Sequence, residues 1–245
     1  MDPQQRLLLE LGYAALHGSS QRRVTLMGGD GGVLLGIERP EWALAQPPLA
    51  RSSVYAVTGD NVSAAAGRVS FVLGLQGPCL SVDTACSSSL VAAHLGYGGL
   101  RSGVCSDAIV CGVNLTLSAY SSGMFKRAGM LAEDGRCKVL DSTADGYVRS
   151  ESCGTLLLRH CESPGDDCSD GLVCSTSVNQ DGRSSSLTAP NGPAQQAVML
   201  RASRDAGVPS ADVLSLQMHG TGTSLGDPIE IGAACAVLGL SLIHI

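Results

Sequence analysis

Short apolar runs alternate with segments of helical periodicity along most of the chain. Period-two or continuous apolar patterns predict strands at residues 33–37, 79–82, 108–113, 154–159, 172–178 and 214–218. Apolar positions at helical spacing predict helices at residues 62–74, 90–100 and 193–206, one starting at Pro3 behind the N-cap Asp2, and one starting near Asp227. Strands and helices interleave, and this order predicts an α/β fold.

Composition narrows the classes of protein. The 245 residues can bury a sizeable core, and 44% hydrophobic against 16% charged residues argues against disorder. The formal net charge of −6, without a basic cluster, argues against nucleic acid as a partner. No apolar run reaches the length of a membrane span, so no membrane partner is expected.

The cysteines point to a reducing compartment. Ten cysteines show no C-x-x-C pair and no histidine spacing typical of zinc, so no metal site is predicted. Without a segment that reads as a signal peptide, we expect reduced thiols and a cytoplasmic protein, although the sequence does not separate cytoplasm from plastid.

One cysteine lies between a predicted strand and a predicted helix. Cys86 follows the strand at 79–82 and precedes the helix at 90–100. At a helix N-terminus, unpaired N–H groups and the macrodipole favour a thiolate and lower a thiol pKa from about 8.5. The three following serines are candidates to satisfy the first N–H groups of that helix. The pattern predicts a nucleophile, but a buried small residue, the usual role of a reduced cysteine, fits it equally well.

A histidine occupies the corresponding position after a second predicted strand. His219 follows residues 214–218 and opens the glycine- and threonine-rich loop 220–226. Glycines let backbone approach a ligand closely, and an imidazole can donate a hydrogen bond to a developing oxyanion. A structural histidine is the alternative for His219 considered alone. Asp227 is a candidate ligand or base, but an Asp-Pro pair ahead of an apolar segment favours a helix start.

Several motifs, in order, resemble the ketosynthase (beta-ketoacyl synthase) domain of type I modular polyketide and fatty acid synthases. They lie at residues 1–7, 55–59, 66–70, 74–79, 83–88, 134–138, 144–149, 179–182 and 219–223. The resemblance implies a thiolase-like layered α/β/α/β/α fold. It also implies an acyltransferase that carries out a decarboxylative Claisen condensation.

The resemblance assigns roles to four residues. Cys86 would take the acyl group, and its own N–H would supply half of an oxyanion hole. His219 and a second histidine would stabilise the enolate formed from a malonyl-type extender. Thr221 and Thr223 would hydrogen-bond the phosphopantetheine arm of an acyl carrier protein.

Cofactors and partners follow from the same resemblance. The expected partners are acyl carrier protein, acyl and malonyl thioesters, and a second copy of the intact parent that meets it along residues 77–83. No metal and no tightly bound cofactor are expected.

The resemblance covers residues 1–239, mostly the N-terminal half of a ketosynthase domain, and predicts truncation at both ends. The family's lysine motif, second histidine and Gly-Phe-Gly turn are not found, so we expect this chain alone to be inactive in condensation. Residues 240–245 do not resemble the family, an assembly artefact is one explanation of them, and His244 is not assigned as the second histidine.

Two other functions fit parts of the sequence. Residues 222–226 fit the Gly-x-Ser-x-Gly elbow of a serine hydrolase with Ser224 as nucleophile, but His219 precedes the serine, whereas that class places its histidine later. The other alternative is an inactive, truncated ketosynthase that acts only as a dimerisation module.

Overall fold

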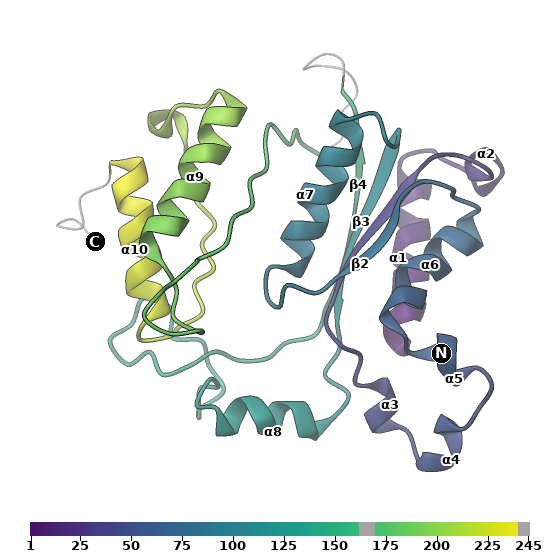
Figure 1. Cartoon of the computed structure of the whole chain (residues 1–245), viewed down its shortest axis with the longest axis horizontal. Helices are drawn as coiled ribbons and strands as arrows, with labels where there is room; N and C mark the ends of the chain where they lie inside the picture. Colours follow the sequence, from purple (N-terminus) through teal and green to yellow (C-terminus); the bar gives the residue numbers. More distant parts are fainter. Residues whose placement is uncertain (162–169, 240–245) are drawn as a thin grey trace. The chain divides into compact units, whose positions relative to one another are not determined.

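The computed structural model describes residues 1–161 and 170–239, which form two compact units (Figure 1). Unit 1 comprises Met1–Ser121 and Ser150–Gly171, and unit 2 comprises Ser122–Arg149 and Leu172–Ile245. Residues 162–169 and the predicted non-family tail at 240–245 lie outside the described residues.

Unit 1 carries the strands and most of the helices. In chain order its elements are α1 (Pro3–Gly18), α2 (Arg23–Leu26), β1 (Gly32–Ile37), α3 (Trp42–Ala45), α4 (Pro48–Arg51), α5 (Ala56–Gly59), α6 (Val62–Leu73), β2 (Cys79–Val82), α7 (Ser88–Arg101), β3 (Asp107–Asn114) and β4 (Ser152–Arg159). Helix α8 (Ala119–Arg127) crosses the boundary between the units. Unit 2 adds α9 (Gly192–Ala206), the 3-10 helix η1 (Ser210–Asp212) and α10 (Gly226–Leu238).

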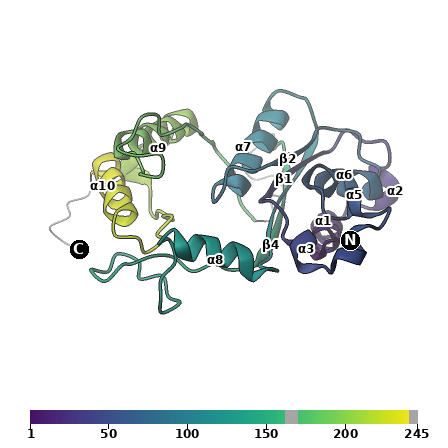
Figure 2. The same cartoon turned by 60° about the horizontal axis from the view of Figure 1, so that its bottom comes forward.

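The four strands form one sheet in the order β2-β1-β3-β4. Strand β1 runs parallel to both β2 and β3, and β4 is antiparallel to β3. Helices α1 and α6 cover one face of this sheet and α7 covers the other, which gives three layers (Figure 2). Every residue of β1 is buried, as expected of a central parallel strand covered on both faces.

The core is divided by the sheet into two clusters. Alternate residues of β1, among them Val33 and Leu35, pack against Leu8 of α1 and Val69 of α6. On the opposite face, Leu34, Ala108 and Val110 pack against Ala92 of α7. The alternation of side chains along each strand therefore assigns each helix to its face.

Local capping signals set the helix ends. The Asp2 carboxylate accepts the Gln4 N–H at 2.8 Å, with Pro3 as the first residue of α1, as the sequence predicts. Asp2 is 1% exposed, and this burial raises the pKa of its carboxyl group. Gly74 and Gly207 end α6 and α9 in the left-handed conformation, at φ 73° and 67°.

Two predicted strands are absent from the described part of the chain. Residues 172–178 and 214–218 have no ladder partner, and Leu214 is 98% exposed. An apolar sequence favours extended backbone, but a strand also requires a neighbour that accepts and donates its hydrogen bonds. The prediction of a buried strand leading into His219 was therefore wrong.

Candidate active site

Cys86 lies in a short loop between β2 and α7, in unit 1. Strand β2 ends at Val82 and α7 begins at Ser88, so the thiol is two residues from the helix. The predicted placement between a strand and a helix N-terminus is confirmed. Cys86 is exposed, which overturns the alternative of a buried packing residue. In open α/β sheets, ligands bind beyond the carboxyl ends of the parallel strands, and Cys86 follows such an end.

The loop around Cys86 is held by its own polar side chains. Ser88, 7% exposed, accepts the Thr84 N–H at 2.8 Å and donates to the Ala85 carbonyl at 2.7 Å. The Ala85 N–H donates to the Asp83 carboxylate at 3.0 Å. These bonds hold Ala85 at φ 56°, a left-handed conformation that costs about 1–2 kcal/mol for a residue with a side chain.

Ser87 and Ser88 bond to the loop and not to the first N–H groups of α7, the role that was predicted for them. Ser87 is the N-cap residue of α7 but makes no side-chain cap bond, and its hydroxyl donates to the Thr84 carbonyl at 2.9 Å. The Ser88 hydroxyl also bonds to the loop. These two serines therefore fix the turn that carries the cysteine.

His219 lies in a loop of unit 2 that is held from α10. The Glu230 carboxylate accepts the backbone N–H of His219 at 2.5 Å and of Gly220 at 2.9 Å. One side chain of a regular helix thus fixes the backbone at the candidate catalytic histidine, which is itself exposed. The sequence analysis did not identify this role of Glu230, because the carboxylate binds backbone N–H groups eleven and ten residues away, which leave no side-chain pattern.

The two candidate ligand threonines lie side by side in the same loop. The hydroxyl oxygens of Thr221 and Thr223 are 3.2 Å apart, and the Thr223 oxygen also accepts the Gly226 N–H at 3.1 Å. Thr223 therefore also satisfies the N–H of the first residue of α10. Among the described bonds, no loop N–H donates to the Thr221 hydroxyl, which contacts only Thr223.

Asp227 organises the end of this loop. It is 3% exposed, and one carboxylate oxygen accepts the N–H groups of Gly222 at 3.1 Å and Thr223 at 3.4 Å. Asp227 lies in the first turn of α10, so the sequence prediction of a helix start is confirmed. Its buried carboxylate is engaged with backbone, as a structural anchor is.

The glycines of the loop permit a close approach of other backbone. Gly222 has φ 75°, and a methyl group on it would lie 2.6 Å from the backbone nitrogen of Lys138. The Gly222 carbonyl also accepts the Gly146 N–H at 3.1 Å. The sequence predicted such an approach for a ligand, whereas here the neighbour is segment 137–146 of the same unit.

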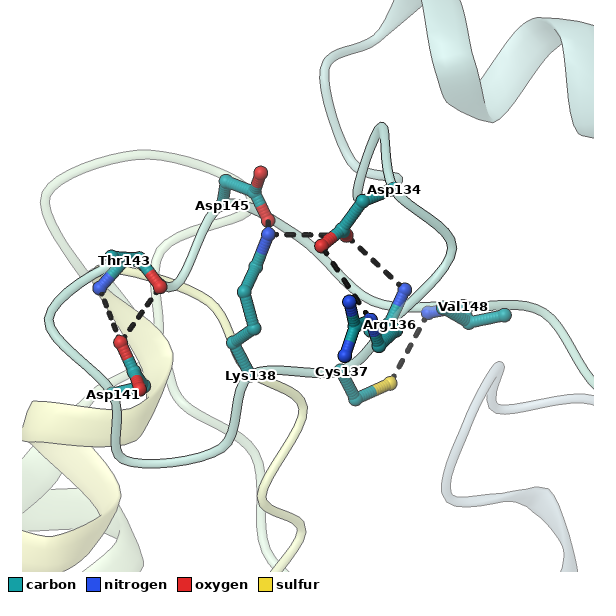
Figure 3. Close-up of polar contacts among 8 residues, drawn as sticks. All are labelled: Asp134, Arg136, Cys137, Lys138, Asp141, Thr143, Asp145 and Val148. Carbon is teal, nitrogen blue, oxygen red and sulfur yellow. Dashed lines mark hydrogen bonds and ion pairs between the residues drawn. The ribbon is translucent and has the colours of Figure 1, made fainter.

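That supporting segment is held by a charged cluster (Figure 3). The Lys138 ammonium lies 2.6 Å from the Asp145 carboxylate and 3.1 Å from the Asp134 carboxylate. The hydrogen bond to Asp145 is the main cause that raises the pKa of Lys138, and the bond from Lys138 lowers the pKa of Asp134. Nearby, Asp141 accepts both the N–H and the hydroxyl of Thr143 at 2.7 Å, which lowers the pKa of Asp141.

The described residues contain no group of three histidine, cysteine or acidic side chains placed to hold a metal ion. Among the same residues, none of the helices combines the length and the apolar character of a membrane span.

Two family models match successive parts of the chain. The beta-ketoacyl synthase N-terminal domain matches residues 1–163, and the beta-ketoacyl synthase C-terminal domain matches residues 171–241. The chain belongs to the beta-ketoacyl synthase family. Cys86 lies within the N-terminal match, and His219, Thr221 and Thr223 lie within the C-terminal match.

The relatives of this beta-ketoacyl synthase chain include polyketide synthases. The erythronolide synthase EryA3 of Saccharopolyspora erythraea is 42% identical over 243 residues, which cover 98% of this chain and 8% of that protein. The pikromycin polyketide synthase component PikAII of Streptomyces venezuelae is 44% identical over 98% of this chain and 6% of its own length. The chain thus spans less than a tenth of the length of these two relatives.

Solved structures agree with the fold. The ketosynthase from module 6 of the bacillaene synthase of Bacillus subtilis 168 superposes with a TM-score of 0.87 at 35% identity, over 98% of this chain and 42% of that one. A ketosynthase domain of the oxazolomycin synthase of Streptomyces albus JA3453 gives 0.86 at 33% identity, over 100% of this chain and 43% of that one. The predicted thiolase-like α/β fold is confirmed, and the structure shows its three-layered part in unit 1.

The serine hydrolase alternative finds no support in this beta-ketoacyl synthase chain. A nucleophile elbow needs a strand that runs directly into the serine. Ser224 instead follows a loop, and the predicted strand at 214–218 is not formed.

Proposed function

We propose that this chain is part of a ketosynthase that joins a cysteine-bound acyl group to a malonyl-type extender in polyketide or fatty acid biosynthesis. The observation that carries the proposal is the exposed Cys86 in a turn fixed between β2 and α7, in a chain of the beta-ketoacyl synthase family. The modular polyketide synthases among its relatives favour a polyketide parent.

The first half-reaction is acyl transfer to Cys86. The thiolate attacks the carbonyl carbon of an acyl thioester, the bond to the carrier sulfur breaks, and the carrier thiolate leaves and takes up a proton. A covalent acyl-enzyme divides a difficult condensation into two easier steps. The fixed turn at 83–88 supports this role because it presents the sulfur and the Cys86 N–H from one rigid segment.

The second half-reaction forms the carbon–carbon bond. A malonyl-type thioester loses carbon dioxide, and the resulting enolate attacks the carbonyl carbon of the Cys86 thioester, which releases the thiolate of Cys86. A His219 imidazole that donates a hydrogen bond to the enolate oxygen would stabilise its charge. The two bonds from Glu230 to the backbone of the His219 loop support a preorganised donor.

We propose that the loop with Thr221 and Thr223 recognises the acyl carrier protein. Thr221 would donate to the phosphopantetheine arm of an acyl carrier protein, and Thr223 would both contact the arm and keep the loop closed through Gly226. Acyl and malonyl thioesters are the proposed substrates, and the protein itself needs no tightly bound cofactor. The proposed location is the cytoplasm.

The test is acylation and condensation by the intact synthase that carries this chain. We expect an acyl thioester to label Cys86, as mapped by peptide mass spectrometry, and a malonyl-carrier to give a beta-ketoacyl product. Cys86→Ala should abolish both, whereas His219→Ala should permit labelling but reduce condensation by about a hundred- to a thousandfold. Label on another cysteine, with Cys86→Ala fully acylated, would overturn the assignment.

We also propose that the intact parent is a homodimer that meets along the β2 edge. Strand β2 is the terminal strand of the sheet, and Leu80 within it is 46% exposed. An edge strand offers a row of hydrogen-bonding groups to a second strand. Light scattering should show twice the protomer mass, and a stable, active monomer would rule the dimer out.

A further inference from the structure

Two glycines lie side by side on neighbouring strands, beneath the first turn of α7. Gly36 of β1 and Gly112 of β3 are direct register partners. A methyl group on Gly112 would lie 2.9 Å from Ser89 Cβ, and one on Gly36 would lie 2.5 Å from the Ser89 nitrogen. These separations are well below van der Waals contact, so the first turn of α7 occupies space that side chains would fill at any other residue type.

We propose that Gly36 and Gly112 are positioning residues for Cys86, and we call the pair the glycine seat. The seat lets the first turn of α7 rest directly on the two central strands. Because the cysteine lies two residues before this turn, the depth of the seat sets where the sulfur stands. This proposal rests on the proposed function only in that Cys86 is the acylated residue.

The link from the seat to the sulfur is a continuous set of short contacts. A methyl group on Gly36 would also lie 2.8 Å from the carbonyl oxygen of Ser88, so the seat contacts Ser88 as well as Ser89. The buried Ser88 hydroxyl is bonded to both Thr84 and Ala85. The segment that holds Cys86 is therefore tied at one end to β2 and at the other to a helix turn whose distance from the sheet the glycines fix.

The contact between α7 and the sheet can yield least at the N-terminal end of the helix. Farther along α7, a methyl group on Gly96 would lie 2.9 Å from Cγ2 of Val110, an outer atom of a side chain. At the seat, the neighbours are backbone atoms and a Cβ, which move only with the helix itself. A displacement at the seat is therefore transmitted to Cys86.

A pair of substitutions, one on each side of the contact between Gly112 and Ser89, tests the proposal. Gly112→Ala adds a Cβ to the strand, and Ser89→Gly removes the Cβ that it would strike. The double variant Ser89→Gly with Gly112→Ala therefore relieves the contact. Gly154→Ala is the matched control, because Gly154 is the β4 register partner of Gly112 and a methyl group on it would meet no atom within 4 Å.

The experiment measures acylation of Cys86 by an acyl thioester in the full-length protein, together with alkylation of Cys86 by iodoacetamide as a function of pH. We expect Gly112→Ala to slow acylation about ten- to a hundredfold, since displacing a reacting group by about 1 Å has effects of that size. We also expect the pH profile of Cys86 alkylation to differ from that of the wild type, because the turn that carries the sulfur is displaced relative to the end of β2. The double variant should return both readouts to the values of Ser89→Gly alone, and Gly154→Ala should match the wild type.

The proposal is overturned if Gly112→Ala and Gly154→Ala give the same acylation rate and alkylation profile. It is also overturned if the double variant does not reach the values of Ser89→Gly alone. Should Gly112→Ala fail to fold in a thermal melt, the comparison of the double variant with Ser89→Gly still decides. Failure of the proposed function gives a different result: wild-type Cys86 would then be alkylated but not acylated by any thioester. The alkylation profiles of the variants would still test the seat.

Discussion

The carboxylate of Asp227 accepts the backbone N–H of Leu140 at 2.8 Å and so joins the first turn of α10 to a loop of unit 2 that lies 87 residues earlier in the chain. The other oxygen of the same carboxylate accepts the N–H groups of Gly222 and Thr223, in the loop whose two threonines are proposed to contact the carrier arm. One buried side chain thus ties the His219 loop to the segment that supports it.

Removing that carboxylate should destabilise unit 2. Asp227→Ala leaves three N–H groups without their acceptor. The bond to Gly222 is buried, and an unsatisfied buried donor costs about 1–3 kcal/mol. Urea unfolding should therefore show a fall of at least about this size in the free energy of unfolding. Asp205→Ala, which removes an exposed carboxylate of α9, is the control and should change little. Equal stability of the two variants would show that Asp227 is not an anchor.

Gly222 should be intolerant of a side chain for two separable reasons. Its φ of 75° alone costs about 1–2 kcal/mol for alanine, and a methyl group would also strike the backbone nitrogen of Lys138 at 2.6 Å. Gly182 has a similar φ of 64° with no atom within 4 Å of an added methyl group. Gly182→Ala therefore measures the backbone cost, and Gly222→Ala should lower the melting temperature further. A smaller effect at Gly222 than at Gly182 would contradict the close approach.

Two cysteines should differ sharply in alkylation. Burial, and secondarily the neighbouring Cys111, raises the pKa of Cys153 to about 11, whereas Cys137 is exposed. At pH 8 only about one Cys153 in a thousand is a thiolate. In the native protein, iodoacetamide should label Cys137 well before Cys153, and labelling of Cys153 should rise with pH up to about 11. Peptide mass spectrometry measures both, and equal rates at pH 8 would refute the burial of Cys153.

The charged cluster around Lys138 should stabilise unit 2 over a defined pH range. The pKa of Asp134 is lowered from 3.8, so its contribution is present above pH 3.8 and is lost as the pH falls through the lowered pKa. The pKa of Lys138 is raised from 10.5, so its contribution is present below pH 10.5 and is lost as the pH rises through the raised pKa.

Lys138→Met should therefore lower the urea midpoint more at pH 7 than at pH 2. Lys126→Met, which removes an exposed ammonium of α8, is the control and should show no such dependence on pH. A Lys138→Met effect of equal size at both pH values would show that the lysine acts through packing of its carbon chain and not through its charge.

The sequence by itself determined the features that depend on near neighbours along the chain. The cap at Asp2, the helices α6 and α9, the four strands of the sheet and the position of Cys86 ahead of α7 were all predicted. Capping, turn conformation and hydrophobic periodicity act within a few residues, so their signals are present in the local sequence. The family motifs added the assignment of Cys86 and His219, which local pattern alone left open.

Only the tertiary structure decided what depends on residues far apart in sequence. The exposure of Cys86, the seat formed by Gly36 and Gly112, and the bond from Leu140 to Asp227 all require segments that meet in space. The same reason explains the wrong prediction at residues 214–218. An apolar pattern selects extended backbone locally, but a strand exists only where another strand lies within hydrogen-bonding distance.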